Sequence, residues 1–422
     1  MSIWARSPAR WSIGGEPKSL SDLRIAGLQG WARWNKLTLI LHPTRATDAG
    51  AYSLTSMQRR QFIQSAGAVV FGAGLVPHLQ TFALAASQAP ATMEVFAGAI
   101  GPGAYDAGSF LQARFHDPRG MAVDAQGNVF VADYVNSVVR KLGTDGQVTL
   151  IAGQVEQRDA RNGPALQARF YSPECVAVAA DGTVYISDSG SNTVRRLDRQ
   201  GQVSTLAGKL EVEGFADGPG AQARFNHPVG LGVNAQGVLY VADAYNSTVR
   251  RISPQGRVST LAGSPGDTGW RDGQGHRARF NTPVGLALDK QGQVFVSEYF
   301  NNVIRKITPD GRVSTFAGQP GKGGFADGDA REALFLHPQT LSFAPDGSLI
   351  VADTGNNRVR RIAPDGAVST LAGAGANEKV VTGALPGELH LPYGVQALAD
   401  GSVLVTGLNA ILRIQPAAAL KS

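Results

Sequence analysis

Gly127-Asn-Val-Phe-Val-Ala-Asp133 is the stretch that decides the fold, because the chain repeats its pattern six times. The other five copies are Gly182-Thr-Val-Tyr-Ile-Ser-Asp188, Gly237-Val-Leu-Tyr-Val-Ala-Asp243, Gly292-Gln-Val-Phe-Val-Ser-Glu298, Gly347-Ser-Leu-Ile-Val-Ala-Asp353 and Gly401-Ser-Val-Leu-Val-Thr-Gly407. The last residue of each copy advances by 55 positions, except for a final step of 54. A fixed period of this length indicates a repeat architecture.

Each repeat unit holds four short apolar runs that are separated by glycine turns. In the third unit these runs are residues 229–233, 238–241, 248–252 and 257–262. Their length and their β-branched content predict strands rather than helices. Runs that are apolar on both faces predict covered sheets, and four-stranded sheets packed around an axis form a β-propeller. The expected fold is therefore all-β, a six-bladed β-propeller of four-stranded blades.

The two ends of the repeat array predict how the ring closes. The sixth unit stops at its third strand, residues 410–414, whereas Met93-Glu-Val-Phe-Ala-Gly98 matches the fourth-strand pattern of the other units. Because closure removes sheet edges that invite aggregation, we expect this N-terminal strand to complete the sixth blade. Residues 93–422 number 330, or six times 55, so the propeller is expected to fill them without a second domain.

Residues 57–85 resemble a twin-arginine export signal. They combine the adjacent Arg59 and Arg60, an aromatic residue two positions later, a mild apolar run and a small-x-small site. The run is too short and broken for a membrane span, so contact with the membrane is expected only during export. Residues 1–56 hold four of the five tryptophans and lack the repeat pattern, and we interpret them as an extension or a mis-assigned start before Met57. The expected location is periplasmic or secreted.

The basic charge of the chain is concentrated in this N-terminal part. The formal net charge is +6, but nine of the 39 basic and three of the 33 acidic residues lie in residues 1–85, which leaves 30 of each in the rest. A neutral body does not favour nucleic acid as a partner, because phosphate binding needs a net basic face.

The single cysteine, Cys175, excludes an internal disulfide. We expect a monomer.

The first repeat unit resembles an NHL repeat. The resemblance rests on Pro118-Arg-Gly-Met-Ala-Val-Asp124, Val129-Phe-Val-Ala-Asp133, Asn136 and Val139-Arg140-Lys141, and it extends over the chain after the leader. The connector with Asp217-Gly218 and Ala223-Arg224-Phe225 resembles a bacterial subgroup of such proteins. The resemblance implies a propeller that usually serves as a binding platform. Some relatives and look-alikes are amidating lyases or gluconolactonase-like enzymes, and others bind RNA or act as extracellular sensors, so the fold alone does not fix the function.

An acid lies seven residues before an arginine in each of the five complete units. The pairs are Asp133 and Arg140, Asp188 and Arg195, Asp243 and Arg250, Glu298 and Arg305, and Asp353 and Arg360. The sixth unit loses both partners together, to Gly407 and Leu412. This joint loss predicts structural salt bridges across the second hairpin, desolvated between blades. Three residues after the acid, an asparagine is expected to fix the turn, as at Asn136, Asn246, Asn301 and Asn356.

A second arginine repeats in the long connectors, which are expected on the same face as the acid-Asn turns. It occurs at Arg114, Arg169, Arg224 and Arg279, with Leu334 and Glu388 at the remaining positions. These arginines either pair with nearby carboxylates such as Asp217 or form a partial ring around the channel mouth that receives an anionic ligand.

The copies differ from one another just after the connector proline, near the expected channel entrance. The six residues there are Arg119, Glu174, Val229, Val284, Gln339 and Tyr393. Asp117, His227 and His337 lie just before the proline, with His116 and His390 one position further out. We take Arg119, Glu174, Gln339 and Tyr393, together with the four connector arginines, as candidate ligand-binding residues. His227 and His337 are candidate metal ligands, and no cofactor is expected apart from a divalent metal that such residues could hold in the channel.

These features favour a binding protein over an enzyme. We expect an exported propeller that acts as a binding or scaffold module for a protein, peptide or glycan on its connector-bearing face. The alternative is a metal-assisted lactonase, hydrolase or lyase at the channel mouth. No residues repeat the Glu/Asn/Asp constellation of a lactonase, and no Ser-His-Asp order, phosphate loop or Cys-His zinc spacing appears.

Overall fold

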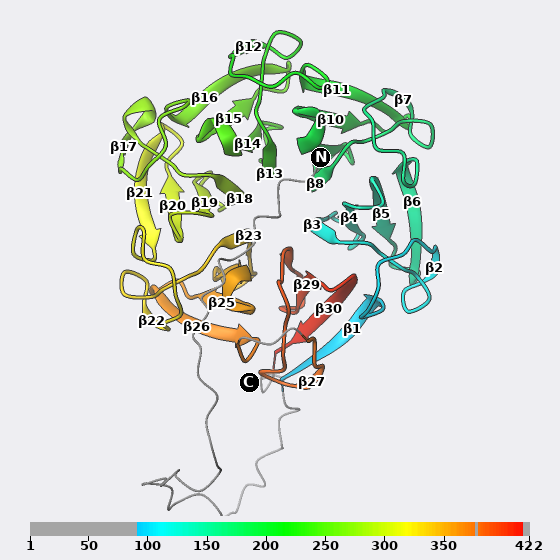
Figure 1. Ribbon diagram of the computed structural model, residues 1–422, viewed down its shortest axis with the longest axis vertical. Helices are drawn as coiled ribbons and strands as arrows, with labels where there is room; N and C mark the ends of the chain where they lie inside the picture. The colour runs from blue at the N-terminus through cyan, green and yellow to red at the C-terminus, as the bar shows by residue number, and fades with distance from the viewer. Residues whose placement is uncertain (1–90, 376–378, 417–422) are drawn as a thin grey trace, which may run out of the picture. The chain divides into compact units, whose positions relative to one another are not determined.

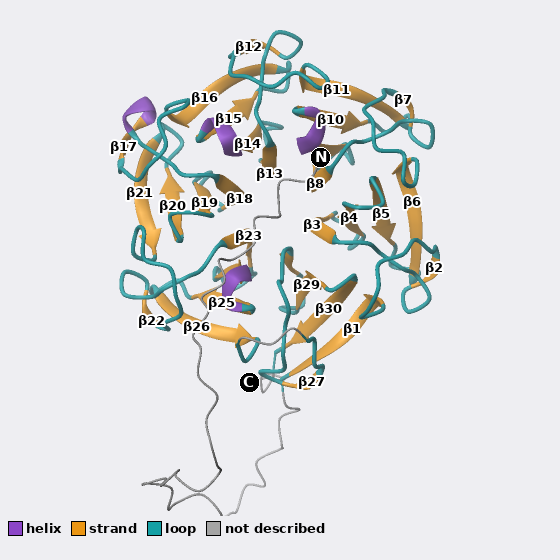
Figure 2. Ribbon diagram, viewed as in Figure 1, coloured by secondary structure: helices purple, strands orange, loops and turns teal. Residues whose placement is uncertain are grey.

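The computed structural model describes residues 91–375 and 379–416, which form a ring of six β-sheets (Figure 1). The extension and the export signal expected over residues 1–85 lie outside the described residues. Strands dominate the ring, and the described helical segments are short 3-10 turns (Figure 2). These turns are η1 (Ser189–Ser191), η2 (Ala244–Asn246), η3 (Gly275–Arg277) and η4 (Thr354–Asn356). In the described parts of the chain, no helix has the length and hydropathy needed to cross a membrane.

Each sheet is one blade, and the blades are numbered here in chain order. Blade 1 contains β2 (Gly108–Ser109), β3 (Pro118–Val123), β4 (Val129–Asp133), β5 (Val138–Leu142) and β6 (Gln147–Gly153). Blade 2 contains β7 (Gly163–Pro164), β8 (Pro173–Val178), β9 (Val184–Asp188), β10 (Thr193–Leu197) and β11 (Gln202–Gly208). Blade 3 contains β12 (Gly218–Pro219), β13 (Pro228–Val233), β14 (Leu239–Asp243), β15 (Thr248–Ile252) and β16 (Arg257–Gly263).

The other three blades repeat this arrangement. Blade 4 contains β17 (Gly273–Gln274), β18 (Pro283–Leu288), β19 (Val294–Glu298), β20 (Val303–Ile307) and β21 (Arg312–Ala317). Blade 5 contains β22 (Gly328–Asp329), β23 (Pro338–Phe343), β24 (Leu349–Asp353), β25 (Arg358–Ile362) and β26 (Ala367–Ala372). Blade 6 contains β27 (Gly383–Ala384), β28 (Val395–Ala397), β29 (Val403–Gly407), β30 (Ala410–Gln415) and β1 (Thr92–Gly98).

The strand order is the same in every blade. In blade 1 it is β2-β6-β5-β4-β3, so that β3 lines the channel and β6 runs along the outer rim (Figure 1). The fifth strand has two residues and pairs with the start of the outermost long strand, as Gly108 does with Val148. The predicted four-stranded blade is thus extended by a short outer strand, because a two-residue strand carries no alternation that a sequence pattern could reveal.

The N-terminal strand closes the ring, as the repeat pattern predicts. Strand β1 pairs antiparallel with β30, from Thr92 opposite Gln415 to Gly98 opposite Ala410. The outer long strand of blade 6 therefore comes from the start of the propeller, while its other long strands come from the end. The prediction of an all-β, six-bladed propeller closed in this way is confirmed.

The core lies between neighbouring blades. One phenylalanine in each of five connectors is fully buried there, and these residues are Phe115, Phe170, Phe225, Phe280 and Phe335. Phe170, for example, packs in one cluster with Val139 of blade 1 and Ile186 of blade 2. Burying such a side chain stabilises the fold by about 1.5–3 kcal/mol, so each phenylalanine fastens a connector to a blade junction.

The acid-arginine pairs are ion pairs inside the blades, and the side chains of all five have no exposed surface. Asp243 Oδ2 lies 2.7 Å from Arg250 Nη1. Its Oδ1 accepts a hydrogen bond from the backbone N–H of Asn226 at 2.8 Å, and its Oδ2 accepts another from the Asn246 amide. The acid thus fastens its own turn to the end of the connector, directly before the proline, and so positions the residues of the channel mouth.

A hydroxyl group links neighbouring blades at every second junction. Ser187 and Ser297 hold this position in blades 2 and 4, Thr406 holds it in blade 6, and alanine replaces it in blades 1, 3 and 5. Ser187 Oγ accepts a hydrogen bond from the Cys175 N–H and donates one to the carbonyl of Val229 in the next blade. Ser297 and Thr406 donate in the same way to the carbonyls of Gln339 and Arg119. Each hydroxyl therefore fixes the backbone of a residue that follows a connector proline.

Candidate functional site

The six innermost strands surround a central channel. A cavity of about 300 Å³ lies in it, lined in blade 1 by residues 120–123 and by the matching residues of the other blades. The residue after each connector proline directly precedes this lining. Arg119, Glu174, Val229, Val284, Gln339 and Tyr393 therefore stand at the mouth of the channel on the connector-bearing face.

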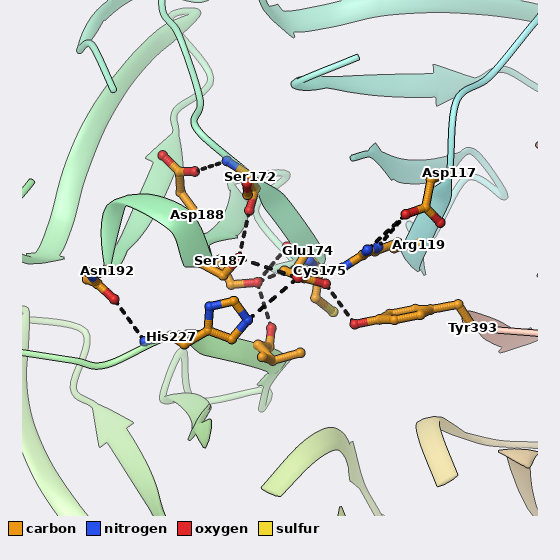
Figure 3. Close-up of polar contacts among 12 residues, drawn as sticks. Asp117, Arg119, Ser172, Glu174, Cys175, Ser187, Asp188, Asn192, His227 and Tyr393 are labelled. Atoms are coloured by element: carbon orange, nitrogen blue, oxygen red, sulfur yellow. Dashed lines mark hydrogen bonds and ion pairs between the residues drawn. The ribbon is translucent and has the colours of Figure 1, made fainter. Parts of the chain in front are cut away.

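Glu174 is the centre of this mouth (Figure 3). Its Oε1 accepts a hydrogen bond from Arg119 Nη1 at 2.6 Å, and its Oε2 accepts one from the Tyr393 hydroxyl at 2.7 Å. The Ser189 hydroxyl donates to Oε1 at 3.4 Å, and His227 Nε2 lies 3.8 Å from the same oxygen. Since Tyr393 belongs to blade 6 and Glu174 to blade 2, their hydrogen bond spans blade 1. We call Arg119, Glu174, Tyr393 and His227 the Glu174 hub.

Burial and mutual contact both shift the pKa values of the hub. Burial alone would raise the pKa of Glu174, but the charge of Arg119 and the contacts with His227 and Tyr393 outweigh it, and the pKa is lowered. Burial and the neighbouring Glu174 raise the pKa of Tyr393 well above its ordinary value. Burial lowers the pKa of His227 in spite of Glu174. The hub thus holds an ionised Glu174–Arg119 pair, a neutral tyrosine and a neutral imidazole at pH 7.

Arg119 also connects the hub to two tyrosine rings. Its guanidinium lies 3.3 Å from the centre of the Tyr134 ring and 4.8 Å from that of Tyr393. Asp117 Oδ2 lies 2.8 Å from Arg119 Nη2, which gives the cation a second carboxylate. Arg119 is therefore held by two acids and two rings, so it acts as a fixed part of the mouth rather than as a free cation.

The blades opposite Arg119 form an apolar half of the mouth. Val229 and Val284 pack with Ala244 in a small cluster, against which Tyr299 lies. The His227 ring stacks on Tyr245 at 4.5 Å between ring centres, and His337 stacks on Tyr299 at 4.3 Å. Phe300 stands edge-on to Tyr299. We call His227, Tyr245, Tyr299, Phe300 and His337 the aromatic patch.

Most of the predicted mouth residues are in contact with one another. Arg119, Glu174 and Tyr393 meet in the hub, and Val229 and Val284 meet in the apolar cluster. Gln339 is buried, and its carbonyl accepts the hydrogen bond of Ser297.

The sequence left two alternatives for the four connector arginines, pairing with nearby carboxylates or a partial ring around the channel mouth. Arg114 donates to the carbonyls of residues 111–113, directly after the rim strand β2, and Arg224 donates to the carbonyls of residues 221 and 223, directly after the rim strand β12. Arg169 pairs with Asp159, and Arg279 pairs with Asp267. These guanidinium groups lie beside the outer connectors rather than at the mouth.

The carboxylate that the sequence offered to these connector arginines has another partner. Asp217 lies 2.7 Å from the buried Arg250 and not beside Arg224. Asp272 and Asp327 pair in the same way with Arg305 and Arg360. Asp217 and Arg224 lie close in sequence but do not pair. The connector folds back over the blade and brings Asp217 to the third strand, which carries Arg250.

The two candidate metal ligands lie in different blades. His227 precedes β13 and stacks on Tyr245, whereas His337 precedes β23 and stacks on Tyr299. In residues 91–375 and 379–416, no three side chains of His, Cys, Asp or Glu gather as metal ligands would. The residues present therefore do not fit the metal centre that the sequence left open.

Several mouth residues were not predicted, namely Tyr134, Arg158, Tyr245, Tyr299 and Phe300. Arg158 lies 5.6 Å from the Tyr134 ring and donates to the Tyr171 carbonyl. The signal was available in the repeat, because the positions that correspond to Arg158 hold Gly103, Glu213, Thr268 and Gly323. This connector position therefore varies from copy to copy and serves no role that all blades share.

Comparisons with known proteins match individual repeat units of this chain. The family model described as NHL repeat matches residues 170–197, 225–252 and 335–362. NHL repeat-containing protein 2 from Bos taurus is 27% identical over 298 residues, which cover 62% of this chain and 41% of that protein. Protein SUPPRESSOR OF QUENCHING 1, chloroplastic, from Arabidopsis thaliana is 33% identical over 173 residues, which cover 39% of this chain and 16% of that protein. The chain spans less than half the length of these curated relatives.

Solved structures agree on the fold. A structural genomics protein of unknown function from Bacteroides thetaiotaomicron superposes with a TM-score of 0.59 at 19% identity, covering 77% of this chain and 75% of that chain. An auxiliary nutrient binding protein from the same organism also gives a TM-score of 0.59, at 15% identity, covering 77% of this chain and 76% of that chain. At such identities the likeness concerns the fold alone. The chain is a six-bladed β-propeller, and three of its segments match the NHL repeat.

Proposed function

We propose that this propeller is a binding module that seats a protein, peptide or glycan ligand at the mouth of its channel, on the connector-bearing face. The observation that carries the proposal is the exposed aromatic patch beside the Glu174 hub. Tyr245 is 58% exposed and Phe300 is 53% exposed, and both rings belong to the aromatic patch. Exposed apolar groups that are concentrated in this way are typical of a surface that a partner covers.

The divergence of the repeats supports the same conclusion. The five complete blades keep the same ion pair and connector phenylalanine, which serve the fold. The residues after the connector proline differ in every blade except blades 3 and 4, where valine recurs. A common scaffold with varied residues at one mouth is an arrangement suited to recognising one asymmetric ligand.

Export forms part of the proposal. Arg59 and Arg60 would direct the chain through the twin-arginine route to the periplasm or the exterior. N-terminal sequencing of the protein recovered from its cellular location tests this. A mature terminus shortly after Ala85 is expected, and an intact Met1 would overturn it.

Array binding tests the binding role. The mature protein, its Tyr245→Ala/Phe300→Ala variant and a Leu166→Ala control are compared on the same glycan and peptide arrays. Leu166 is also exposed, at 58%, but follows the rim strand β7. The ligands of the unmodified protein should be lost from the double variant and kept by the control. Ligands that all three proteins bind equally would place recognition elsewhere and overturn the proposal.

A further inference from the structure

Arg158 is a cation at the mouth that the Glu174 hub does not use. Its Nε donates to the Tyr171 carbonyl at 3.4 Å and its Nη2 to the Ser172 hydroxyl at 3.5 Å, both long contacts with neutral acceptors. Among the residues that the structure describes, no carboxylate forms an ion pair with it. The adjacent Asp159 pairs with Arg169, and Asp117 and Glu174 both pair with Arg119. The exposed guanidinium thus keeps its hydrogen-bonding capacity for an anionic group.

The aromatic patch offers flat surfaces at the same mouth. His227 covers one face of Tyr245 at an interplanar angle of 10°, and His337 covers one face of Tyr299 at 5°. Stacking holds each ring in one orientation, so little conformational entropy is lost when a ligand binds the other face. Tyr299 of the second pair packs against the apolar Val229–Val284 cluster, and His227 of the first pair lies beside Glu174 of the hub. A series of contacts therefore runs from Arg158 through Tyr134, Arg119 and Glu174 to His227.

The chemistry of the mouth suits a sugar chain. A pyranose ring presents an apolar C–H face and hydroxyl groups at its rim. Flat aromatic faces flanked by polar groups match that pattern, and a carboxylate on the sugar would match Arg158.

On the basis of the proposed binding role, we propose that the mouth takes an oligosaccharide in which at least one sugar carries a carboxylate. Sugar rings lie against Tyr245 and against Tyr299 with Phe300, and the carboxylate binds Arg158. Asp117 and Glu174 repel any acid that approaches the hub itself, so the carboxylate is confined to the Arg158 side. Uronic acid chains have this chemistry.

Calorimetric titration of the mature protein with tetragalacturonate and with its methyl ester tests the proposal. The ester has the same rings without the charge, and it should bind at least about tenfold more weakly, as expected for the loss of one charge-assisted hydrogen bond. Arg158→Ala should weaken binding of the acid by a similar factor and leave the ester unchanged. The control is Arg199→Ala, an exposed arginine in the turn between β10 and β11 on the opposite face. Tyr245→Ala should weaken both ligands about fivefold. Thermal unfolding of each variant verifies that it folds.

The other possible results of the titrations overturn different parts of the proposal. If the ester binds as tightly as the acid and Tyr245→Ala weakens both, the carboxylate assignment is overturned while the proposed binding role stands. If a tetraglutamate peptide binds as tightly as tetragalacturonate, charge alone is recognised and the sugar assignment is overturned. If neither sugar binds, the inference fails, and the array comparison decides separately whether the mouth binds another class of ligand.

Discussion

Replacing Asp133 by asparagine should destabilise the propeller more than the same replacement of Asp243. Both acids are buried partners of an arginine, Arg140 in blade 1 and Arg250 in blade 3. The two arginines differ in their second partner. Asp217 lies 2.7 Å from Arg250 Nη2 and also accepts from its Nε, whereas Nε of Arg140 has no hydrogen-bond partner among the described residues.

The reason lies in one connector position. Asp217, Asp272 and Asp327 occupy it in blades 3 to 5, Asn162 occupies it in blade 2, and Ala107 occupies it in blade 1. Removing one member of a buried pair costs about 3–5 kcal/mol, because the other charge is left uncompensated, and we expect this loss for Asp133→Asn. Asp217, at 42% exposed, still compensates Arg250, so we expect about 1–3 kcal/mol for Asp243→Asn.

Denaturant unfolding of the mature protein measures both losses. Trp270 is the one tryptophan after residue 34, so its fluorescence reports on the propeller, with circular dichroism as a second probe. Two further variants sharpen the comparison. Asp217→Asn added to Asp243→Asn should bring the loss to that of Asp133→Asn, and Ala107→Asp should recover part of the Asp133→Asn loss. Equal losses of stability for Asp133→Asn and Asp243→Asn, within about 0.5 kcal/mol, would contradict the compensation of Arg250 by Asp217.

Two more predictions concern the mouth. Ser297→Ala leaves the Gly285 N–H and the Gln339 carbonyl without this hydrogen-bond partner, and it should cost about 1–3 kcal/mol in denaturant unfolding, whereas the exposed Thr144→Ala should cost almost nothing; a neutral Ser297→Ala would contradict the role of the interblade hydroxyl. Burial lowers the pKa of His227 below 6.5, so the unfolded chain binds its proton more readily and stability should fall as the pH drops below about 6.5. His227→Gln should flatten this part of the stability profile, and an unchanged slope would contradict the assignment.

The fold could be predicted from the sequence because a blade is one repeat unit. The pattern at residues 127–133 predicts a strand, and its recurrence at 55-residue steps predicts six blades. The strand pattern at residues 93–98 predicts how the ring closes. The two-residue outer strands escaped prediction because strands such as Gly108–Ser109 have neither length nor alternation. The hydroxyl links at Ser187 and Ser297 also escaped, because their partners belong to the next blade.

The site could be predicted by position and only partly by contact. Comparing the copies located Arg119, Glu174 and Tyr393 at the mouth, but their meeting depends on how the ring brings blades 1, 2 and 6 together. The connector arginines suggested a partial ring around the channel mouth because they occupy the same position in each repeat unit. Shared phase fixes the height of a residue in its blade but not the direction of a long side chain, and Arg114 turns back to its own loop.

Hydrogen exchange of the mature protein, with and without saturating tetragalacturonate, tests the central claim that a ligand seats at the connector-side mouth. Slower amide exchange is expected in the turns around residues 132–137 and 244–247 and in the connector around residue 158. These segments carry Tyr134, Tyr245 and Arg158. Slower exchange confined to opposite-face turns, such as residues 198–201 and 253–256, or no change anywhere at saturation, would contradict it.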